Sequence, residues 1–306
     1  MTDSSGREAI RISVVVPTFN RAESLARCLA ALAGQSLDSR VYEVIVVDDG
    51  SADRTEAVCT RARAAIRNFL VYRQANRGPA AARNAGIRLA SGEIVAFTDD
   101  DCVPPRDWLE KVLQRFDRER ELVGLGGVMV TPADDWVPLS HHSDVTAVGQ
   151  GGASRFIGTN NAAYRRGALL EAGGFDEGFR HVSVEDADLY IRVRRLGVTA
   201  LDETIYVWHP ARLTGLMEAV RGFIRFYRGY LALQKKYPEE FKELYGTAPE
   251  SLVLMGRDWR GRARRYTRGM IRHPLRGAMF IVYLVLSRGA VVWLWLTRQR
   301  RANALG

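Results

Sequence analysis

Three consecutive carboxylates follow an apolar run in the stretch FTDDDCVP. Residues 93–97 are mostly apolar and lead directly into Asp99, Asp100 and Asp101. Adjacent like charges repel one another, so their placement needs a counter-charge. An Asp-x-Asp pair offers the hard oxygen ligands that Mg²⁺ and Mn²⁺ take together with substrate phosphates. Asp99 and Asp101 therefore predict a divalent metal site, the alternative being a solvated acidic loop before a helix.

A second acidic cluster, Asp48-Asp49-Gly50-Ser51, also follows an apolar β-branched run. One of its carboxylates is placed to accept a hydrogen bond from a base or a ribose, and Gly50 permits a tight turn. The same four residues are an ordinary turn and helix N-cap sequence. Taken alone, the cluster leaves both interpretations open.

Arg83 is the odd member of an alanine-rich face in the stretch Pro79 to Ala90. A guanidinium group has the fork geometry that binds a phosphate. An exposed arginine on a helix is the alternative, and without the other motifs it is the simpler interpretation.

Glu185 and Asp186 open a predicted helix over 183–196, with Ser183 as its N-cap. The helix dipole favours acids at this position, which is a structural explanation for both. The glycine-rich run GGFDEGF precedes them, however, and an aspartate at a cleft can act as a general base. His209 ends another apolar strand; a lone histidine is usually structural, but beside a metal it is a candidate third ligand.

The elements that must position these groups alternate between β-branched runs and Ala- and Leu-rich stretches, which predicts βαβ units and a parallel sheet. Ligands bind beyond the carboxyl ends of such strands, so both acidic clusters are expected in one cleft. Asn20 and Glu23 resemble a helix N-cap with a capping box. The expected strands are 12–17, 44–47, 69–72 and 94–97, the expected helices include 53–66, 79–90 and amphipathic helices within 213–275, and 131–152 is expected to be a loop.

Seven motifs, taken in order, resemble the family 2 glycosyltransferases of the GT-A fold. The resemblance covers about residues 10–210 and implies an α/β, Rossmann-like fold: a mixed, mainly parallel sheet flanked by helices. It places a catalytic domain at 1–212 and leaves a helical, basic C-terminal extension at 213–306. The motifs are VVVPTFNR (14–21), VVDDGS (46–51), NRGPAAARNAGI (76–87), FTDDDCVP (97–104), GTNNAAYRR (158–166), GGFDEGF (173–179) and EDADLYIRVRRLG (185–197).

The resemblance implies inverting transfer of one sugar from a nucleotide-diphosphate sugar, with Mg²⁺ or Mn²⁺ as cofactor. Asp186, beside Glu185, would be the catalytic base. Asp101 would bind the cation with His209 as a partner, and Asp99 would face the ribose and the metal. The other residues expected around the donor are Pro17, Thr18, Phe19, Asn20, Arg21, Asp49, Arg83, Asp100, Gly158, Thr159 and Asn160.

Two departures from the family pattern affect the expected reaction. Cys102 stands where the family often has a fourth acidic residue, although the Asp-x-Asp pair is intact. The QxxRW motif of processive polysaccharide synthases is absent from the sequence. A single addition to a lipid-linked, saccharide or small-molecule acceptor is therefore expected.

The cysteines and the N-terminal residues indicate the cellular compartment in which the protein is expected. The three cysteines are scattered without a CxxC pair, which is typical of free thiols in a reducing compartment. The first residues contain no apolar segment typical of a secretory signal. The catalytic part is therefore expected in the cytoplasm.

The C-terminal segment 257–306 carries twelve arginines and one acidic residue, within a chain of net charge +9. These arginines flank the apolar stretch 278–296 and alternate with aromatic residues, which suits an anionic membrane surface better than a nucleic acid. Arg288 in mid-stretch makes a spanning helix costly, so peripheral binding at the inner face of the cell membrane is predicted. A helix that packs on the catalytic domain or in a homodimer is the alternative.

Three other functions compete with the transferase interpretation. A dehydrogenase needs GxGxxG after the first strand, where Pro17-Thr18-Phe19-Asn20 stands instead. A nucleotidyltransferase would carry a Gly- and Arg-rich loop at that place and release pyrophosphate. A catalytically silent nucleotide-sugar-binding or membrane scaffold protein would need Asp49 and Asp101 but not Asp186.

Overall fold

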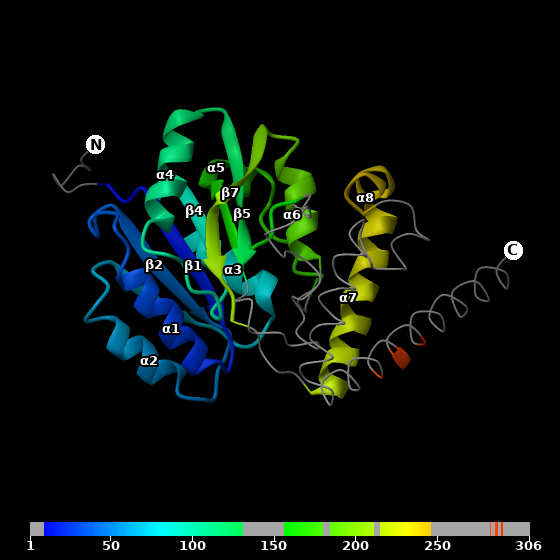
Figure 1. Cartoon of the computed structure of the whole chain (residues 1–306), viewed down its shortest axis with the longest axis horizontal. Helices are drawn as coiled ribbons and strands as arrows, with labels where there is room; N and C mark the ends of the chain where they lie inside the picture. Colours follow the sequence, from blue (N-terminus) through cyan, green and yellow to red (C-terminus); the bar gives the residue numbers. More distant parts are fainter. Residues whose placement is uncertain are drawn as a thin grey trace, which may run out of the picture. The chain divides into compact units, whose positions relative to one another are not determined.

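The structure, a computed structural model, describes residues 9–130, 156–179, 184–210 and 215–245, with four single positions at 282, 285, 286 and 289 (Figure 1). The described residues up to Pro210 belong to one compact unit, and those from Gly215 onward belong to a second. The predicted loop 131–152 lies outside the described residues, as does the apolar stretch 278–296 apart from the four single positions.

The first unit is built on one seven-stranded sheet with the order β3-β2-β1-β4-β6-β5-β7. Only β6 runs against its neighbours, β4 and β5, so the sheet is mixed and mainly parallel, as predicted. The four strands expected from the sequence are all present and extend by one to three residues. The strands are β1 (Ile12–Thr18), β2 (Tyr42–Asp48), β3 (Phe69–Arg73), β4 (Ile94–Thr98), β5 (Leu122–Val130), β6 (Asn161–Arg165) and β7 (Val198–Trp208).

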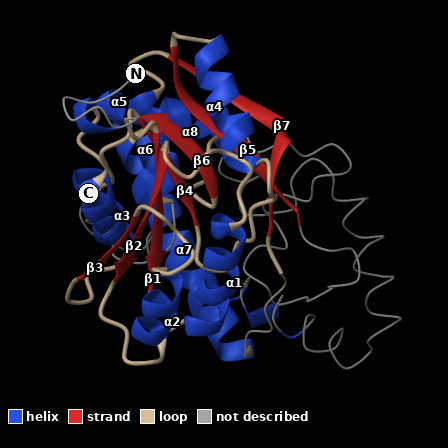
Figure 2. Ribbon diagram, turned by 90° about the vertical axis from the view of Figure 1, so that its left-hand side faces the viewer, coloured by secondary structure: helices blue, strands red, loops and turns tan. Residues whose placement is uncertain are grey.

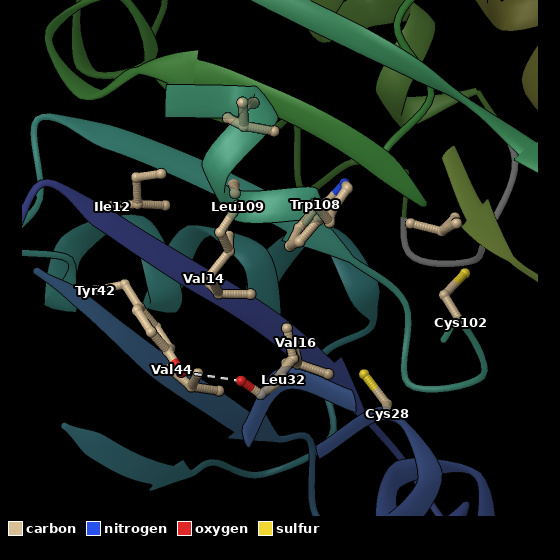
Figure 3. Packing of buried hydrophobic residues seen from close by; sticks show 14 of the residues in the cluster. Ile12, Val14, Val16, Cys28, Leu32, Tyr42, Val44, Cys102, Trp108 and Leu109 are labelled. Carbon is tan, nitrogen blue, oxygen red and sulfur yellow. Dashed lines mark hydrogen bonds between the residues drawn. The ribbon is translucent and has the colours of Figure 1, made fainter. Parts of the chain in front are cut away.

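Helices cover both faces of this sheet, so the central strand β1 is buried on both sides. Ile12, Val14 and Val16 of β1 pack with apolar residues of α1, α2 and α4, as Figure 3 shows for Leu32, Trp108 and Leu109. The intervening residue Val15 packs with residues of α3, α5 and α6 on the opposite face. Figure 2 shows the sheet between the helices. The helices of this unit are α1 (Ala22–Ala33), α2 (Thr55–Ala62), α3 (Pro79–Leu89), α4 (Trp108–Arg118), α5 (Arg166–Glu171) and α6 (Glu185–Val193).

One glycine fixes how closely α3 approaches the sheet. A Cβ atom at Gly86 would lie 2.3 Å from Val15 Cγ1, which is inside van der Waals contact. Only glycine therefore lets α3 pack this closely on β1. The close packing places Arg83, one turn earlier in α3, near the strand ends that carry the acidic clusters.

The predicted capping box at Asn20 is wrong. The α1 helix begins after Arg21, whose own side chain does not cap it, and the Ala22 N–H donates instead to the Asp53 carboxylate. Asn20 has a left-handed φ of 54°, its Oδ1 atom accepts a hydrogen bond from the Ala52 N–H, and its own N–H donates to Ser51 Oγ. The Oδ1 atom and the backbone N–H of Asn20 therefore tie the loop after β1 to the loop after β2 instead of capping α1.

Two predicted helices are shorter than expected. The expected helix 53–66 is α2 and covers Thr55–Ala62. The expected helix 183–196 is α6 and begins at Glu185, and Ser183, its expected N-cap, lies outside the described residues. The carboxylate of Asp53 accepts the Thr55 N–H, which explains why α2 begins later.

The second unit contains α7 (Leu216–Lys236) and α8 (Pro238–Tyr245), in agreement with the predicted amphipathic helices. Tyr230 of α7 packs against Phe241 and Tyr245 of α8, with ring centroids 4.4 and 5.0 Å away. Among the residues described, neither these helices nor any other combines the length and the apolar character that crossing a membrane would need.

Candidate active site

The predicted site residues gather at one edge of the sheet. Because β1, β2 and β4 are parallel, they end toward the same edge: Thr18 is paired with Asp48, and β4 ends at Thr98, one residue after the pair of Phe97 with Val15. The antiparallel strand β6 begins at this edge, with Asn161 paired to Thr98. The loops after β1, β2 and β4 and the loop before β6 therefore converge there, as the sequence predicted.

Asp100 and Asp101 are held by a shared arginine. Arg21 donates through Nη1 to Asp101 Oδ2 at 2.6 Å and to Asp100 Oδ1 at 3.1 Å. The other oxygen of Asp100 accepts a hydrogen bond from Thr18 Oγ1 at 2.7 Å. Burial raises the pKa of Asp100 to about 7, although the Arg21 guanidinium lowers it. The repulsion expected between the adjacent carboxylates is thus offset by Arg21 and by a partly protonated Asp100.

His209 lies on the other side of Asp101. Its Nε2 atom is 3.3 Å from Asp101 Oδ1, and its backbone N–H donates to the Val130 carbonyl. Burial lowers the pKa of His209, but the hydrogen bond and the charge of Asp101 outweigh it and leave the pKa raised. The structure therefore brings together Asp101 and His209, two residues predicted as metal ligands from distant parts of the sequence.

Cys102 is a third potential ligand that sequence reasoning missed. The carboxylate of Asp101, the thiol of Cys102 and the imidazole of His209 have ligand atoms within 4.8 Å of one another. The scattered cysteines had no histidine at metal-ligand spacing in the sequence, and no pattern links Cys102 to His209. One oxygen, one nitrogen and one sulfur ligand suit a divalent first-row metal, so the residues present fit a cation.

Asp99 belongs to a different ion network, centred on Arg83. Arg83 donates through Nη2 to Asp99 Oδ1 at 2.8 Å and through Nη1 to Glu185 Oε1 at 3.0 Å. The Arg83 side chain is only 4% exposed, so the interpretation of an exposed helix arginine is wrong. Arg83 instead joins the first acid of the Asp-x-Asp pair to the residue before Asp186.

Asp186 is the partly exposed acid of its motif. Burial of the carboxyl group, reinforced by Glu185, raises the pKa of Asp186 to about 7. A Cβ atom at Gly158 would lie 3.7 Å from Asp186 Oδ2, so the loop before β6 passes directly beside this carboxylate. Asp188 is fully buried and accepts two hydrogen bonds from Arg192. Of these two aspartates, Asp186 is therefore the one that can meet a substrate.

The glycine-rich run 173–179 is fastened to α3 by Asn84. The Asn84 amide donates to the Phe175 carbonyl and accepts the Phe175 N–H, at 2.9 and 2.8 Å. Gly174 has a φ of 69°, and a Cβ atom there would lie 2.5 Å from Asn84 Oδ1. The glycine-rich run is thus tied to α3, the helix that carries Arg83.

The loop after β1 and the loop after β2 form the other end of the site. Pro17 is the penultimate residue of β1, and Phe19 exposes 45% of its surface. Asp49 is buried, and its two oxygens accept hydrogen bonds from the N–H groups of Arg77 and Gly78. The carboxylate of Asp49 therefore orders the turn before α3, and its contact with a base remains a prediction.

The loop before β6 is anchored by Asn161, which the sequence did not single out. Its Oδ1 atom accepts a hydrogen bond from Trp108 Nε1 at 2.9 Å, and its amide donates to the Val128 and Ile205 carbonyls. A second asparagine directly after Asn160 in GTNNAAYRR was its only signal in the sequence. Thr159 is buried, and Asn160 donates to Met129 Sδ.

Comparison with known proteins agrees with this architecture. The family model described as Glycosyl transferase family 2 matches residues 13–181. Glycosyltransferase AglE of Haloferax volcanii is 41% identical over 101 residues, which are 33% of each chain. Pre-mycofactocin glycosyltransferase of Mycobacterium tuberculosis is 32% identical over 272 residues, 82% of this chain and 52% of that protein. This chain thus spans between a third and about half the length of these two relatives.

Solved structures share the fold at low sequence identity. The mannosyltransferase PcManGT from Pyrobaculum calidifontis, in complex with GDP-Man and Mn²⁺, superposes with a TM-score of 0.57 at 20% identity, over 98% of this chain and 81% of that one. S. aureus TarS 1-349 in complex with UDP-GlcNAc gives a TM-score of 0.55 at 18% identity, over 92% and 89% of the two chains. These neighbours confirm the predicted GT-A arrangement.

Proposed function

This chain belongs to glycosyl transferase family 2, and from its site we propose that it is an inverting, metal-dependent transferase. It would move one sugar from a nucleotide-diphosphate sugar to a hydroxyl group of a lipid-linked, saccharide or small-molecule acceptor. One observation carries this proposal: Asp186, with a pKa near 7, stands beside Gly158 at the edge of the sheet. Glu185 and Arg83 tie Asp186 to Asp99 of the Asp-x-Asp pair.

The donor would bind where the loops after β1, β2 and β4 meet. Phe19 offers an exposed ring to a base, and Arg21 and Arg83 supply positive charge near a diphosphate. Asp101 and His209, with Cys102 beside them, would hold a Mg²⁺ or Mn²⁺ ion. Such an ion would supply Lewis acid charge that stabilises the departing diphosphate. The Mn²⁺ and GDP-Man named for PcManGT support this assignment by analogy.

Asp186 would act on the acceptor. A carboxylate whose pKa is raised by burial and by Glu185 is a stronger base than an ordinary aspartate and is suited to take a proton from a hydroxyl group. As that proton passes to Asp186, the acceptor oxygen attacks the anomeric carbon on the face opposite the diphosphate. The bond from this carbon to the diphosphate oxygen breaks with its electron pair. One such displacement inverts the configuration and needs no second carboxylate nucleophile.

The test is turnover of a panel of nucleotide sugars with Mn²⁺ or Mg²⁺, with and without membrane lipid extract. Release of the nucleoside diphosphate is measured for the wild type, Asp101→Asn and the control Asp117→Asn, which changes an exposed acid on α4. We expect one donor to turn over, to need the cation and to lose turnover only in Asp101→Asn. Binding without turnover would favour the scaffold protein, and release of pyrophosphate would favour a nucleotidyltransferase.

The C-terminal segment 257–306 would hold the protein at the inner face of the cell membrane. Its arginines and aromatic residues support peripheral binding to anionic lipids. We expect a chain without residues 257–306 to leave vesicles of anionic phospholipid and still bind the donor. Unchanged partitioning with the vesicles would overturn this assignment and favour packing within the protein or a homodimer.

A further inference from the structure

Both carboxylate oxygens of Asp101 already have partners at the site proposed for the cation. Oδ2 accepts a hydrogen bond from Arg21 Nη1 at 2.6 Å, and Oδ1 lies 3.3 Å from His209 Nε2. A divalent cation that binds Asp101 competes with these contacts for the carboxylate oxygens. A guanidinium group and a divalent ion cannot share Asp101 at contact distance without strong repulsion, because both are positively charged.

Arg21 is the partner that is free to leave. Its side chain is 39% exposed, whereas that of His209 is 3% exposed. Arg21 also stands just outside α1, with φ −138° and ψ 42°, so the helix does not fix its direction. His209, by contrast, directly follows β7, and its backbone N–H donates to the carbonyl of Val130 at the end of β5.

We propose that Arg21 occupies the place of the cation in the free protein and moves onto the donor diphosphate when the cation binds Asp101. This inference rests on the proposed function, because it takes the ligands to be a divalent ion and a nucleoside diphosphate. In the free protein the guanidinium offsets the negative charge of Asp100 and Asp101. When the cation and the donor are bound, the cation offsets the negative charge of Asp100 and Asp101. The released Arg21 guanidinium then pairs with phosphate oxygens.

The exchange links the two ligands thermodynamically. The cation alone must displace Arg21 without a new partner for the guanidinium, so it binds weakly. A diphosphate offers that partner, so it raises the affinity for the cation, and by reciprocity the cation raises the affinity for the diphosphate. Arg21 is thus a positioning residue that favours binding of the cation and the donor together over binding of either one alone.

Opposite effects on the two ligands separate this role from a merely structural one. Removal of the charge in Arg21→Gln frees Asp101 and should strengthen Mn²⁺ binding in the absence of nucleotide, by up to about fivefold for a partly exposed pair. The same change removes a phosphate contact and should weaken UDP or GDP binding at saturating Mn²⁺, by about tenfold or more. Damage to the fold would weaken both.

The experiment measures Mn²⁺ binding by electron paramagnetic resonance of the free ion, and UDP and GDP binding by calorimetry at saturating Mn²⁺. Arg27→Gln is the matched control, because Arg27 is an exposed arginine on α1 whose described hydrogen bond goes to Ser24. It should behave as the wild type. Equal or weaker Mn²⁺ binding by Arg21→Gln would overturn the exchange.

Failure of this inference is distinguishable from failure of the proposed function. If the wild type turns over a nucleotide sugar but Arg21→Gln does not bind Mn²⁺ more tightly, the exchange is wrong and the transferase assignment stands. If Arg21→Gln binds Mn²⁺ more tightly but the wild type turns over no donor, Arg21 does stand in for a cation and the transferase assignment is wrong.

Discussion

Arg21 pairs with the Asp100–Asp101 cluster, and Arg83 pairs with Asp99 and with Glu185 of the Glu185–Asp186 cluster, but the two arginines differ in burial. Arg21, beside Asp100 and Asp101, has a side chain that is 39% exposed, and Arg83, between Asp99 and Glu185, has one that is 4% exposed. An exposed ion pair contributes little to stability and is readily exchanged, whereas a buried charge that loses its partner is strongly unfavourable. Arg21 is therefore a counter-ion that can be exchanged, whereas Arg83 is a buried counter-ion that stays in place.

This difference matches what each cluster would have to do. The Asp100–Asp101 cluster would receive a cation and a diphosphate, so its counter-charge has to be able to move. The Glu185–Asp186 cluster would deliver a base to one fixed position, so its counter-charge has to stay. Arg83 also donates to Asp99, which directly precedes the Asp100–Asp101 cluster, so it links the two clusters.

Removing the two arginines should separate their roles most strongly in stability. Arg83→Met leaves Asp99 and Glu185 without their buried partner, so we expect the free energy of unfolding to fall by about 3–5 kcal/mol. Arg21→Met should cost less than about 1 kcal/mol, because that pair is partly exposed. Urea unfolding followed by circular dichroism measures both. Equal losses in the two variants would contradict the distinction between a fixed and an exchangeable arginine.

The pH profile of activity tests the role of Asp186, the proposed base in the Glu185–Asp186 cluster. The pKa of Asp186 is raised to about 7, and only its deprotonated form can accept a proton. We therefore expect kcat/KM to fall about tenfold per pH unit below pH 7 and to level off above it.

Asp100 is the control for this profile, because its pKa is also raised to about 7. In Asp100→Asn the acidic limb should remain, since the base is untouched. If the limb disappears in this variant, the titration belongs to the Asp100–Asp101 cluster and not to Asp186.

The smallest expected effect concerns the thiol beside the exchangeable cluster. If Cys102 is a ligand together with Asp101 and His209, Co²⁺ should give a thiolate-to-metal absorption band in the near ultraviolet. Cys102→Ser should lose this band and bind Co²⁺ roughly tenfold more weakly, a loss typical of changes around a metal. Cys59→Ser, in α2, should keep it. A wild-type Co²⁺ complex without the band would show that Cys102 is not a ligand.

Much of the fold was accessible from the sequence because its signals are local. The β-branched runs around Val14, Val46 and Val95 predict strands, and parallel strands with alternating helices place their carboxyl ends at one edge. The Asp-x-Asp pair and the Glu185–Asp186 pair stand out for the same reason, since each is contiguous in the chain.

The contacts that define the site were less accessible because they join distant residues. Nothing near Arg83 in the sequence indicates that Glu185 is its partner or that Arg83 is buried. The proximity of Cys102 to His209 depends on where β7 ends, and no local pattern in the sequence indicates that end. The capping-box prediction at Asn20 was wrong for a related reason. The spacing from Asn20 to Glu23 fits a capping box, but the hydrogen bonds of Asn20 go to the loop after β2.

The most direct test of the central claim is to measure donor binding and turnover in the same preparations of wild type and Asp186→Asn. The claim is that the Asp100–Asp101 cluster binds the donor and that Asp186 only removes the acceptor proton. We expect kcat to fall by about 10²- to 10⁴-fold while the donor dissociation constant changes by less than about threefold. Turnover equal to that of the wild type would show that Asp186 is not the base and would contradict the account.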